Sequence, residues 1–266
     1  MADVITSLRN PAVQHLVRLR ERRHRDRSGT FLVEGVLEVD RALQAGAAVE
    51  QLVIGVGQLG SEDRPLSVSE ALGQGVPLLE LGDAAFRKVS YRQNSDGLLA
   101  VVRRFPTGPE RLVPPAPALL LVAESIEKPG NLGAMLRAAD AAGAGGVAVA
   151  DPTTDVFNPN VVRASRGALF TVPLAVGDSK AVRDRLADLE IAPVALDPAA
   201  DKLLWEIDLT GPVALVVGSE HAGLSAVWGD SQSARLPMAG TVDSLNAATT
   251  AGIALFEAVR QRSLTR

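Results

Sequence analysis

Three short segments of the chain combine polar side chains and glycines in patterns that could do chemistry. The first reads ESIEKPGNLGAMLR, in which Asn131 precedes Gly133 by two residues and Arg137 by six. A Pro-Gly turn leads into this run, so Asn131 is expected to cap a helix that begins at Leu132. Gly133 and Arg137 would share one face of that helix, where a glycine leaves room for a group to approach the guanidinium. A surface ion pair between Arg137 and Asp140 is the alternative interpretation.

The second segment reads VVGSEHAGLSAVW and follows an apolar run of strand length. Backbone amides exposed around Gly218 and Ser219 could bind a nucleoside or a carboxylate. Glu220 could accept hydrogen bonds there, or it could simply cap the next helix. His221 could shuttle a proton, or it could merely be exposed.

The third segment reads RLPMAGTVDSLNAATTAGIALF. We expect a short apolar strand, a glycine turn, and then a helix with Ser244 as its N-cap. Small residues at the start of that helix predict unusually close packing against it. The residues concerned are Ala247, Ala248, Ala251 and Gly252.

The elements that must position these segments follow from an alternation of apolar strand-length runs and helical patterns. A run with five prolines between residues 103 and 118 separates a small α/β unit from a second, larger one. Near-continuous Val, Leu and Ala strands in the second unit predict a parallel sheet with helices on both faces, which binds ligands beyond its carboxyl ends. The expected strands are 31–35, 49–55, 76–81, 97–102, 118–123, 146–150, 171–176, 191–196 and 212–218, and the expected helices include 35–45, 66–74 and 245–261.

The composition excludes several classes of protein. There is no cysteine, and the three histidines, His15, His24 and His221, are scattered along the chain, so we predict no disulfide and no metal site. No apolar run approaches the roughly 18 to 20 residues of a membrane span. The first residues also lack the apolar core and cleavage site of a signal peptide, so we expect a cytoplasmic protein without a membrane partner.

Arginine is concentrated at the start of the chain. Residues 1–30 hold seven arginines and three acidic residues, which gives +4, so the remainder must carry −8 to reach the net charge of −4. A cluster of this kind could neutralise the phosphates of a polyanion. A solvated amphipathic helix with Leu16 and Leu19 facing inward is the alternative interpretation.

Taken in order, the three segments resemble the SpoU family, also called TrmH-like, of RNA ribose methyltransferases in the SPOUT superfamily. NLGAMLR (131–137) matches the first family motif, VGSEHAGL (217–224) the second, and LPMAG (236–240) with Ser244-Leu245-Asn246 the third. The resemblance covers residues 118–262. The first hundred residues resemble, more loosely, a substrate-binding domain related to RNA-binding ribosomal proteins.

The resemblance implies a function and an architecture. The expected activity is transfer of a methyl group from S-adenosyl-L-methionine to a ribose 2′-hydroxyl of a structured RNA, with 23S rRNA ahead of tRNA. Housekeeping modification and self-protection against an antibiotic both fit the family. The expected protein is a homodimer with an RNA-binding domain (1–105), a proline-rich linker (106–117) and a SPOUT domain (118–266), whose C-terminal part is threaded into a trefoil knot.

The resemblance also implies residue roles. The polar catalytic set is Asn131, Arg137, Glu220, Ser244 and Asn246. Main-chain groups around Gly218, Ser219, Glu220, Leu236, Met238, Ser244 and Leu245 are expected to hold the cofactor. The expected RNA contacts are Arg9, Arg18, Arg22, Arg23, Arg25, and either Arg163 or its neighbour Arg166. The family proposal makes the motif-one arginine a base, but a neutral Arg137 near pH 7 would cost on the order of 7 kcal/mol, so binding of the adjacent phosphate is the easier role.

Three rival interpretations remain at the level of sequence. An enzyme of the same fold could methylate a base nitrogen, although NLGAMLR together with SLN favours ribose. A non-catalytic RNA-binding assembly factor is disfavoured because all five polar residues of the catalytic set are present. The glycine-rich run AAGAGGVAVA suggests a dinucleotide-binding enzyme, but its glycines precede a strand, whereas a dinucleotide fingerprint follows one.

Overall fold

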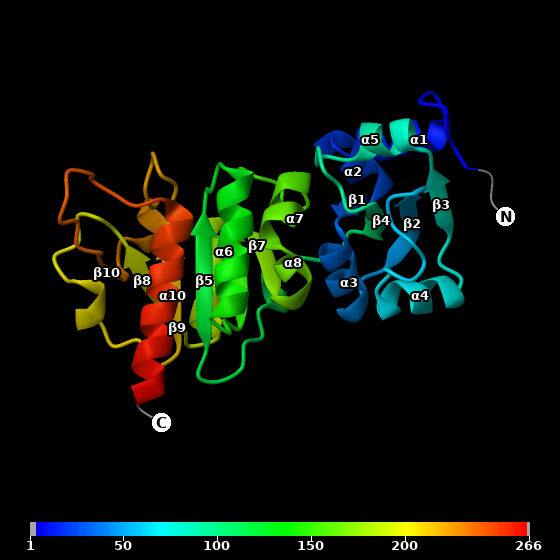
Figure 1. Ribbon diagram of the computed structural model, residues 1–266. Helices are drawn as coiled ribbons and strands as arrows, with labels where there is room; N and C mark the ends of the chain where they lie inside the picture. Colours follow the sequence, from blue (N-terminus) through cyan, green and yellow to red (C-terminus); the bar gives the residue numbers. More distant parts are fainter. Residues whose placement is uncertain (1–3, 265–266) are drawn as a thin grey trace. The chain divides into compact units, whose positions relative to one another are not determined.

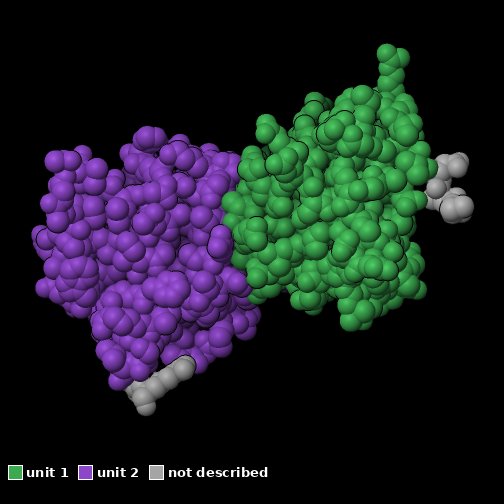
Figure 2. Space-filling view, in the orientation of Figure 1, with its two compact units in different colours: residues 1–105, 157–171 green, residues 106–156, 172–266 purple. Residues whose placement is uncertain are grey.

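The computed structural model describes residues 4–264, which form two compact units (Figures 1 and 2). Unit 1 holds the chain up to Phe105 together with Phe157–Thr171. Unit 2 holds Pro106–Val156 and the chain from Val172 onward. Within residues 4–264, no helix is both long and apolar enough to cross a lipid bilayer.

Unit 1 is built around a four-stranded mixed sheet in the order β1-β4-β2-β3, in which β4 runs antiparallel to β1 and β2 while β2 and β3 are parallel. Every strand and helix expected between residues 31 and 102 is present. The strands are β1 (Thr30–Glu34), β2 (Val49–Gly55), β3 (Leu78–Leu81) and β4 (Leu98–Arg103), and the helices are α1 (Pro11–Arg18), α2 (Arg22–Ser28), α3 (Val36–Gln44), α4 (Leu66–Gly73), α5 (Asp83–Val89), α7 (Pro159–Ser165) and α8 (Ala168–Thr171).

The segment 157–171 packs on unit 1 through aromatic side chains. The ring of Phe157 lies 4.8 Å from that of Phe31 and 5.1 Å from that of Phe105, centroid to centroid. Offset and edge contacts of this kind stabilise a core beyond the area they bury. The units defined by contacts therefore differ from the predicted continuous domain 118–266 at this segment, and the predicted domain bounds stay a prediction.

Arg25 on α2 holds the start of unit 1 together. Its side chain is only 1% exposed, and its Nη1 donates hydrogen bonds to the carbonyls of Leu19 and Arg20 at 2.9 and 2.8 Å. The sequence analysis placed Arg25 among the RNA contacts. That expectation is wrong for direct contact, because a guanidinium buried against backbone carbonyls cannot reach a phosphate.

Unit 2 contains a six-stranded sheet in the order β10-β8-β9-β5-β6-β7, with every neighbouring pair parallel. This confirms the predicted α/β fold with a parallel sheet. The strands are β5 (Leu119–Glu124), β6 (Gly146–Ala150), β7 (Leu174–Gly177), β8 (Ala192–Leu196), β9 (Val213–Val217) and β10 (Gln232–Ala234), and the helices are α6 (Pro129–Ala141), α9 (Ser179–Asp188) and α10 (Ala247–Leu264), with short 3₁₀ turns η1 (Pro109–Arg111), η2 (Leu204–Glu206) and η3 (Ala226–Trp228).

Helices cover both faces of this sheet because successive side chains of a strand point to opposite faces. Leu120 and Val122 of β5 join a core with Val182 and Leu186 of α9. The other face carries α6 and α10, which pack against each other and on β5, as Figure 1 shows. The short strand expected within the third segment lies just before that segment, as β10.

From Pro106 onward, the proline-rich stretch between residues 103 and 118 belongs to unit 2. The carbonyl of Thr107 accepts a hydrogen bond from the Val176 N–H at 2.5 Å, and the carbonyl of Leu112 accepts one from Arg185 at 2.8 Å. Leu112 itself is fully buried. The stretch therefore adds to the core of unit 2, and its role as an interdomain linker stays a prediction.

We predict that Arg25→Ala destabilises unit 1 by roughly 2–4 kcal/mol, because a buried side chain is removed and the carbonyls of Leu19 and Arg20 lose their donor. The matched control is Arg23→Ala on the same helix, whose exposed side chain should change stability by less than about 0.5 kcal/mol. Hydrogen exchange of the β1 and β4 amides measures the effect. Equal protection of these amides in the two variants would contradict the structural role of Arg25.

Candidate functional site

Three of the predicted polar residues, distant in sequence, meet in unit 2. Oε1 of Glu220 accepts hydrogen bonds from Nδ2 of Asn131 at 2.8 Å and from Nδ2 of Asn246 at 2.9 Å. Nδ2 of Asn246 also donates to Oδ1 of Asn131 at 3.1 Å. The first segment, the turn after β9 and the start of α10 are therefore joined by a closed triangle of side chains.

Local chain geometry sets these orientations, and it differs from two predicted caps. Helix α6 begins at Pro129, whose fixed φ suits the first helical position, so Asn131 lies inside the first turn instead of capping it. Helix α10 begins at Ala247, and its cap is Asn246, not Ser244: Oδ1 of Asn246 accepts from the backbone N–H groups of Ala248 and Thr249 at 3.0 and 3.3 Å.

Glu220 also binds a cation that the sequence analysis did not single out. Nζ of Lys128 lies 2.5 Å from Oε2 of Glu220. This hydrogen bond is the main reason that the pKa of Glu220 lies below its ordinary value, and partial burial opposes it. Hydrogen bonds from Asn131 and from the backbone N–H of Ala247 lower the pKa further. The carboxylate is therefore held in its charged form with both oxygens engaged.

A second carboxylate fixes the chain just beyond the turn. Glu124, at the end of β5, is 1% exposed. It accepts hydrogen bonds from the Ser225 N–H and from Trp228 Nε1, both at 2.8 Å, and from the Ser179 hydroxyl at 2.5 Å. Because buried charges are tolerated only when they are well hydrogen-bonded, this arrangement anchors the segment after the turn to the central strand.

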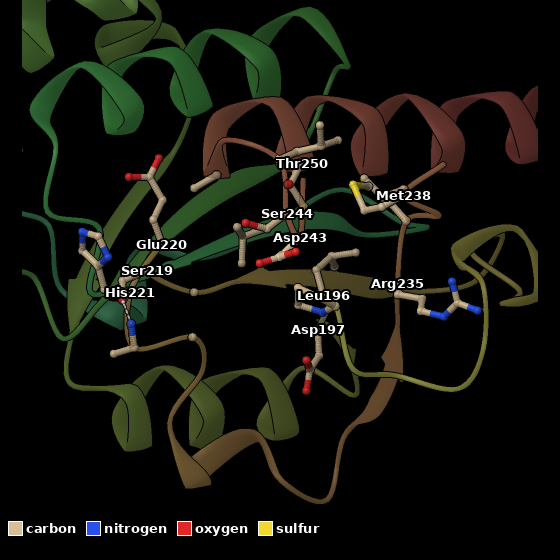
Figure 3. A pocket seen from close by; sticks show the side chains of 18 of the residues that line it. Leu196, Asp197, Ser219, Glu220, His221, Arg235, Met238, Asp243, Ser244 and Thr250 are labelled. Carbon is tan, nitrogen blue, oxygen red and sulfur yellow. Dashed lines mark hydrogen bonds between the residues drawn. The ribbon is translucent and has the colours of Figure 1, made fainter. Parts of the chain in front are cut away.

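A cavity of about 530 Å³ opens beside the triangle, beyond the carboxyl ends of β8 and β9 (Figure 3). Its volume lies in the range of small-molecule and cofactor sites. All seven residues predicted to hold a cofactor line it. The lining includes Leu196, Asp197, Pro198, Gly218, Ser219, Glu220, His221, Arg235, Leu236, Met238, Asp243, Ser244, Leu245 and Thr250.

The wall of the cavity at the turn after β9 requires a glycine. A Cβ added to Gly218 would lie 2.3 Å from the carbonyl oxygen of Gly223, which is closer than van der Waals contact allows. Two stretches of backbone therefore approach each other there, and their polar groups border the cavity. Apolar side chains such as Leu196 and Met238 line other parts of the wall, a mixture of polar and apolar groups that suits a nucleoside-containing ligand.

Sequence reasoning missed part of this site although a signal for it was present. Leu196, Asp197 and Pro198 stand at and just after the carboxyl end of β8, the position at which parallel sheets bind ligands. At the level of sequence, chemical groups were expected only after strands 118–123 and 212–218 and in the third segment. Lys128 had no signal of its own, because only the fold brings it to Glu220.

Arg137 and Ser244, the other two residues of the predicted catalytic set, differ in whether they line the cavity. Ser244 lines the cavity and is labelled in Figure 3. Arg137 is exposed on α6, does not line the cavity, and forms no hydrogen bond or ion pair with any residue of 4–264. The structure therefore brings together Asn131, Glu220 and Asn246, but it does not join Arg137 to them within one chain.

The predicted RNA-binding arginines lie in unit 1, and most are exposed. Arg9, Arg18, Arg22 and Arg23 are all exposed, Arg18 on α1 and the last two on α2. Arg163, on α7, is also exposed, and its guanidinium donates to Asn160 at 3.2 Å. These side chains are accessible to a polyanion.

Two features of unit 1 add to this picture. Arg166 has a left-handed backbone (φ 53°), and its Nη1 lies 3.9 Å from the buried carboxylate of Glu38.

His15 of α1 and His24 of α2, which are scattered in the sequence, lie side by side: Nδ1 of His15 is 3.0 Å from Nε2 of His24. Burial, then His15, then Arg27 and Arg18 lower the pKa of His24.

Comparison with known proteins agrees with the resemblance. Residues 118–256 match the SpoU rRNA Methylase family, and residues 10–100 match the MRM3-like substrate binding domain. The chain is 35% identical over 257 residues to the 23S rRNA (uridine(2479)-2′-O)-methyltransferase of Streptomyces viridochromogenes, covering 92% of this chain and 87% of that protein.

Two solved structures are similar over almost the whole chain. One is an RNA 2′-O ribose methyltransferase, with a TM-score of 0.85, 42% identity, and coverage of 98% of this chain and 100% of that one. The other is an AdoMet-bound rRNA methyltransferase from Sinorhizobium meliloti, with a TM-score of 0.87, 31% identity and coverage of 97% of each chain. With the family match covering more than half of the sequence, the chain belongs to the SpoU rRNA methylase family.

Proposed function

We propose that the protein transfers the methyl group of S-adenosyl-L-methionine to a ribose 2′-hydroxyl of ribosomal RNA, 23S rRNA in particular. The observation that carries the proposal is the cavity beside the Asn131–Glu220–Asn246 triangle, in a chain of this family. The ribosomal substrate rests on the 23S rRNA enzyme to which the chain is similar along most of its length. A ribosomal substrate implies that the enzyme works in the cytoplasm.

The cavity residues would hold the cofactor mainly through the main chain. Backbone groups around Gly218, Leu236 and Leu245 would bind its polar groups, while Leu196 and Met238 would supply apolar wall. When bound, S-adenosyl-L-methionine supplies an activated methyl on its sulfonium. The task left to the protein is to align the 2′-oxygen with that methyl and to exclude water.

We assign the polar residues to positioning and charge stabilisation. Asn131 and Asn246, fixed by Glu220, would orient the ribose, and Ser244 would contact the substrate or the cofactor from the cavity wall. Arg137 would hold the phosphate beside the 2′-hydroxyl and favour alkoxide character as it develops. Its cationic form suits this role without any change of protonation.

We infer that the enzyme is a homodimer in which Arg137 serves the partner's site. Arg137 lies beside Ala138, which is 4.0 Å from the position of a Cβ added to Gly252 at the contact between α6 and α10. Next to that contact, Ile253 and Phe256 of α10 are 42% and 51% exposed. Exposed apolar side chains on one helix are suited to a symmetric interface.

We also propose that the chain forms a deep trefoil knot and that it has two domains joined by a linker. The knot is supported by the return of the chain from β10, at one edge of the sheet, to α10, which packs on β9 and β5. Residues 118–266 would form the methyltransferase domain, 106–117 the linker and 1–105 the RNA-binding domain. The match of residues 10–100 to a substrate binding domain supports the last assignment.

The activity is tested by incubating the protein with methyl-labelled S-adenosyl-L-methionine and unmodified 23S rRNA, then digesting the RNA to nucleosides. We expect one 2′-O-methylated nucleoside, because the site aligns a ribose hydroxyl with the donor methyl. Unmodified tRNA and catalytically inactive Asn131→Ala protein are the controls. Label on a base nitrogen, or in tRNA alone, would contradict the proposal.

Arg137→Ala should lower kcat by about a hundredfold or more, because a group that stabilises developing charge is lost. Its affinity for S-adenosyl-L-methionine, measured by calorimetry, should stay nearly unchanged, because Arg137 does not line the cavity. Loss of cofactor binding with normal turnover at saturation would contradict the role of Arg137.

Mixing inactive chains tests whether Arg137 acts across the dimer. If Arg137→Ala and Asn131→Ala chains form mixed dimers, one of the two sites in each contains both side chains, so activity should recover to roughly a quarter of wild type. If both residues act within one chain, each site of a mixed dimer keeps one defect, and mixing restores nothing.

The triple variant Arg18→Ala/Arg22→Ala/Arg23→Ala should weaken RNA binding and reduce the slope of log affinity against log salt by about 2 to 3, because three phosphate contacts are lost. These exposed side chains can be removed without opening the core formed by Val13, Leu16 and Leu19. An unchanged salt slope would show that α1 and α2 do not face the RNA.

A further inference from the structure

Lys128 stands at the point where the three segments of the site meet. It directly precedes Pro129, the first residue of α6, so its backbone is fixed by the start of that helix. Its ammonium lies 2.5 Å from Oε2 of Glu220, with 62% of the Lys128 side chain and 22% of the Glu220 side chain exposed. An isolated surface ion pair contributes little to stability, so the geometry of this pair matters more than its energy.

The two carboxylate oxygens of Glu220 have different hydrogen-bond partners. Oε2 binds Lys128, and Oε1 accepts both side-chain amides of the triangle, from Asn131 and Asn246. Among the side chains of residues 4–264, Lys128 alone donates to Oε2, and without its ammonium the carboxylate could rotate and offer either oxygen to either amide. Lys128 therefore selects one orientation of Glu220.

Asn246 connects the Glu220 carboxylate to the start of helix α10. Its Oδ1 caps the helix, so its Nδ2 has one direction left, toward Glu220 and Asn131. A turn of the Glu220 carboxylate would break at least one of these hydrogen bonds. The ammonium of Lys128, which touches neither amide itself, therefore controls both through the carboxylate.

Several charged or titratable side chains lie near Glu220, but of these Lys128 forms the ion pair with it. Glu127 directly precedes Lys128, and both line a small hollow together with Glu220. His221 follows Glu220 in the same turn, and Asp243 lines the main cavity shortly before α10. Among residues 4–264, Lys128 is the only cationic side chain that forms an ion pair with Glu220. The start of α10 adds the Ala247 N–H.

We propose that Lys128 is a positioning residue for methyl transfer, which acts by fixing the orientation of the Glu220 carboxylate that holds Asn131 and Asn246. The role rests on the proposed function.

The test replaces the ammonium while keeping its stem, in Lys128→Met, and restores a cation in Lys128→Arg. We expect Lys128→Met to lower kcat by about ten- to a hundredfold, because small misplacements of aligning groups have effects of this size. Calorimetry should show little change in the dissociation constant for S-adenosyl-L-methionine. Lys128→Arg should recover part of the loss. Lys180→Met, which removes an exposed ion pair with Asp184 of similar length, is the matched control and should behave as wild type.

The pH dependence separates positioning from general damage. The ion pair lowers the pKa of Glu220, so its loss must raise that pKa, and the acid limb of the kcat profile should move to higher pH in Lys128→Met only. The same shift should appear in the carboxyl carbon resonance of Glu220 in protein without cofactor, identified through Glu220→Gln. An unchanged resonance midpoint and an unchanged kcat profile would overturn the role of Lys128. Absence of methyl transfer in the wild type would instead overturn the proposed function.

Discussion

The side-chain amide of Asn246 performs two tasks whose geometries must agree, and the rest of the site depends on that agreement. Its oxygen caps α10, and its nitrogen binds both Glu220 and Asn131. One side chain thus joins the start of an 18-residue helix to the polar triangle. A displacement of α10 would reorient the triangle, and a loss of the triangle would leave the amide nitrogen without its partners.

The parallel sheet makes this meeting of distant segments possible. Strands β5, β8 and β9 are neighbours and parallel, so the segments that follow them emerge at one edge. Glu124 ties the chain after the β9 turn to the end of β5, and the absence of a side chain at Gly218 lets two backbone stretches approach there. The cavity and the triangle therefore form at this edge, where residues from the segments that follow different strands meet.

Much of this arrangement could be predicted from the sequence, because the signals are local. Apolar runs fixed the strands from Thr30 to Val217 to within a few residues, and all seven predicted cofactor residues line the cavity. Both predicted caps were wrong for a physical reason. Asn131 and Ser244 are good capping residues, but Pro129 begins its helix earlier and Asn246 begins α10 later. Propensity alone does not decide between neighbouring candidates.

Other features could not be predicted because they are tertiary. Arg25 belongs to an arginine-rich run whose other members are exposed, and only packing shows that its guanidinium turns inward. His15 and His24 are nine residues apart and meet because two short helices fold back. Lys128 reaches Glu220 across 92 residues of sequence. In each case the partner is chosen by the fold, not by spacing.

The central claim is that segments around 131, 218–224 and 236–246 form one methyl-donor site. The most direct measurement is a crystal structure of the protein with S-adenosyl-L-methionine bound. The account predicts the cofactor in the cavity lined by Leu196, Gly218, Met238 and Leu245, with its methyl directed toward the Asn131–Glu220–Asn246 side. Density for the cofactor at any other place, or a methyl that points away from these three residues, would contradict it.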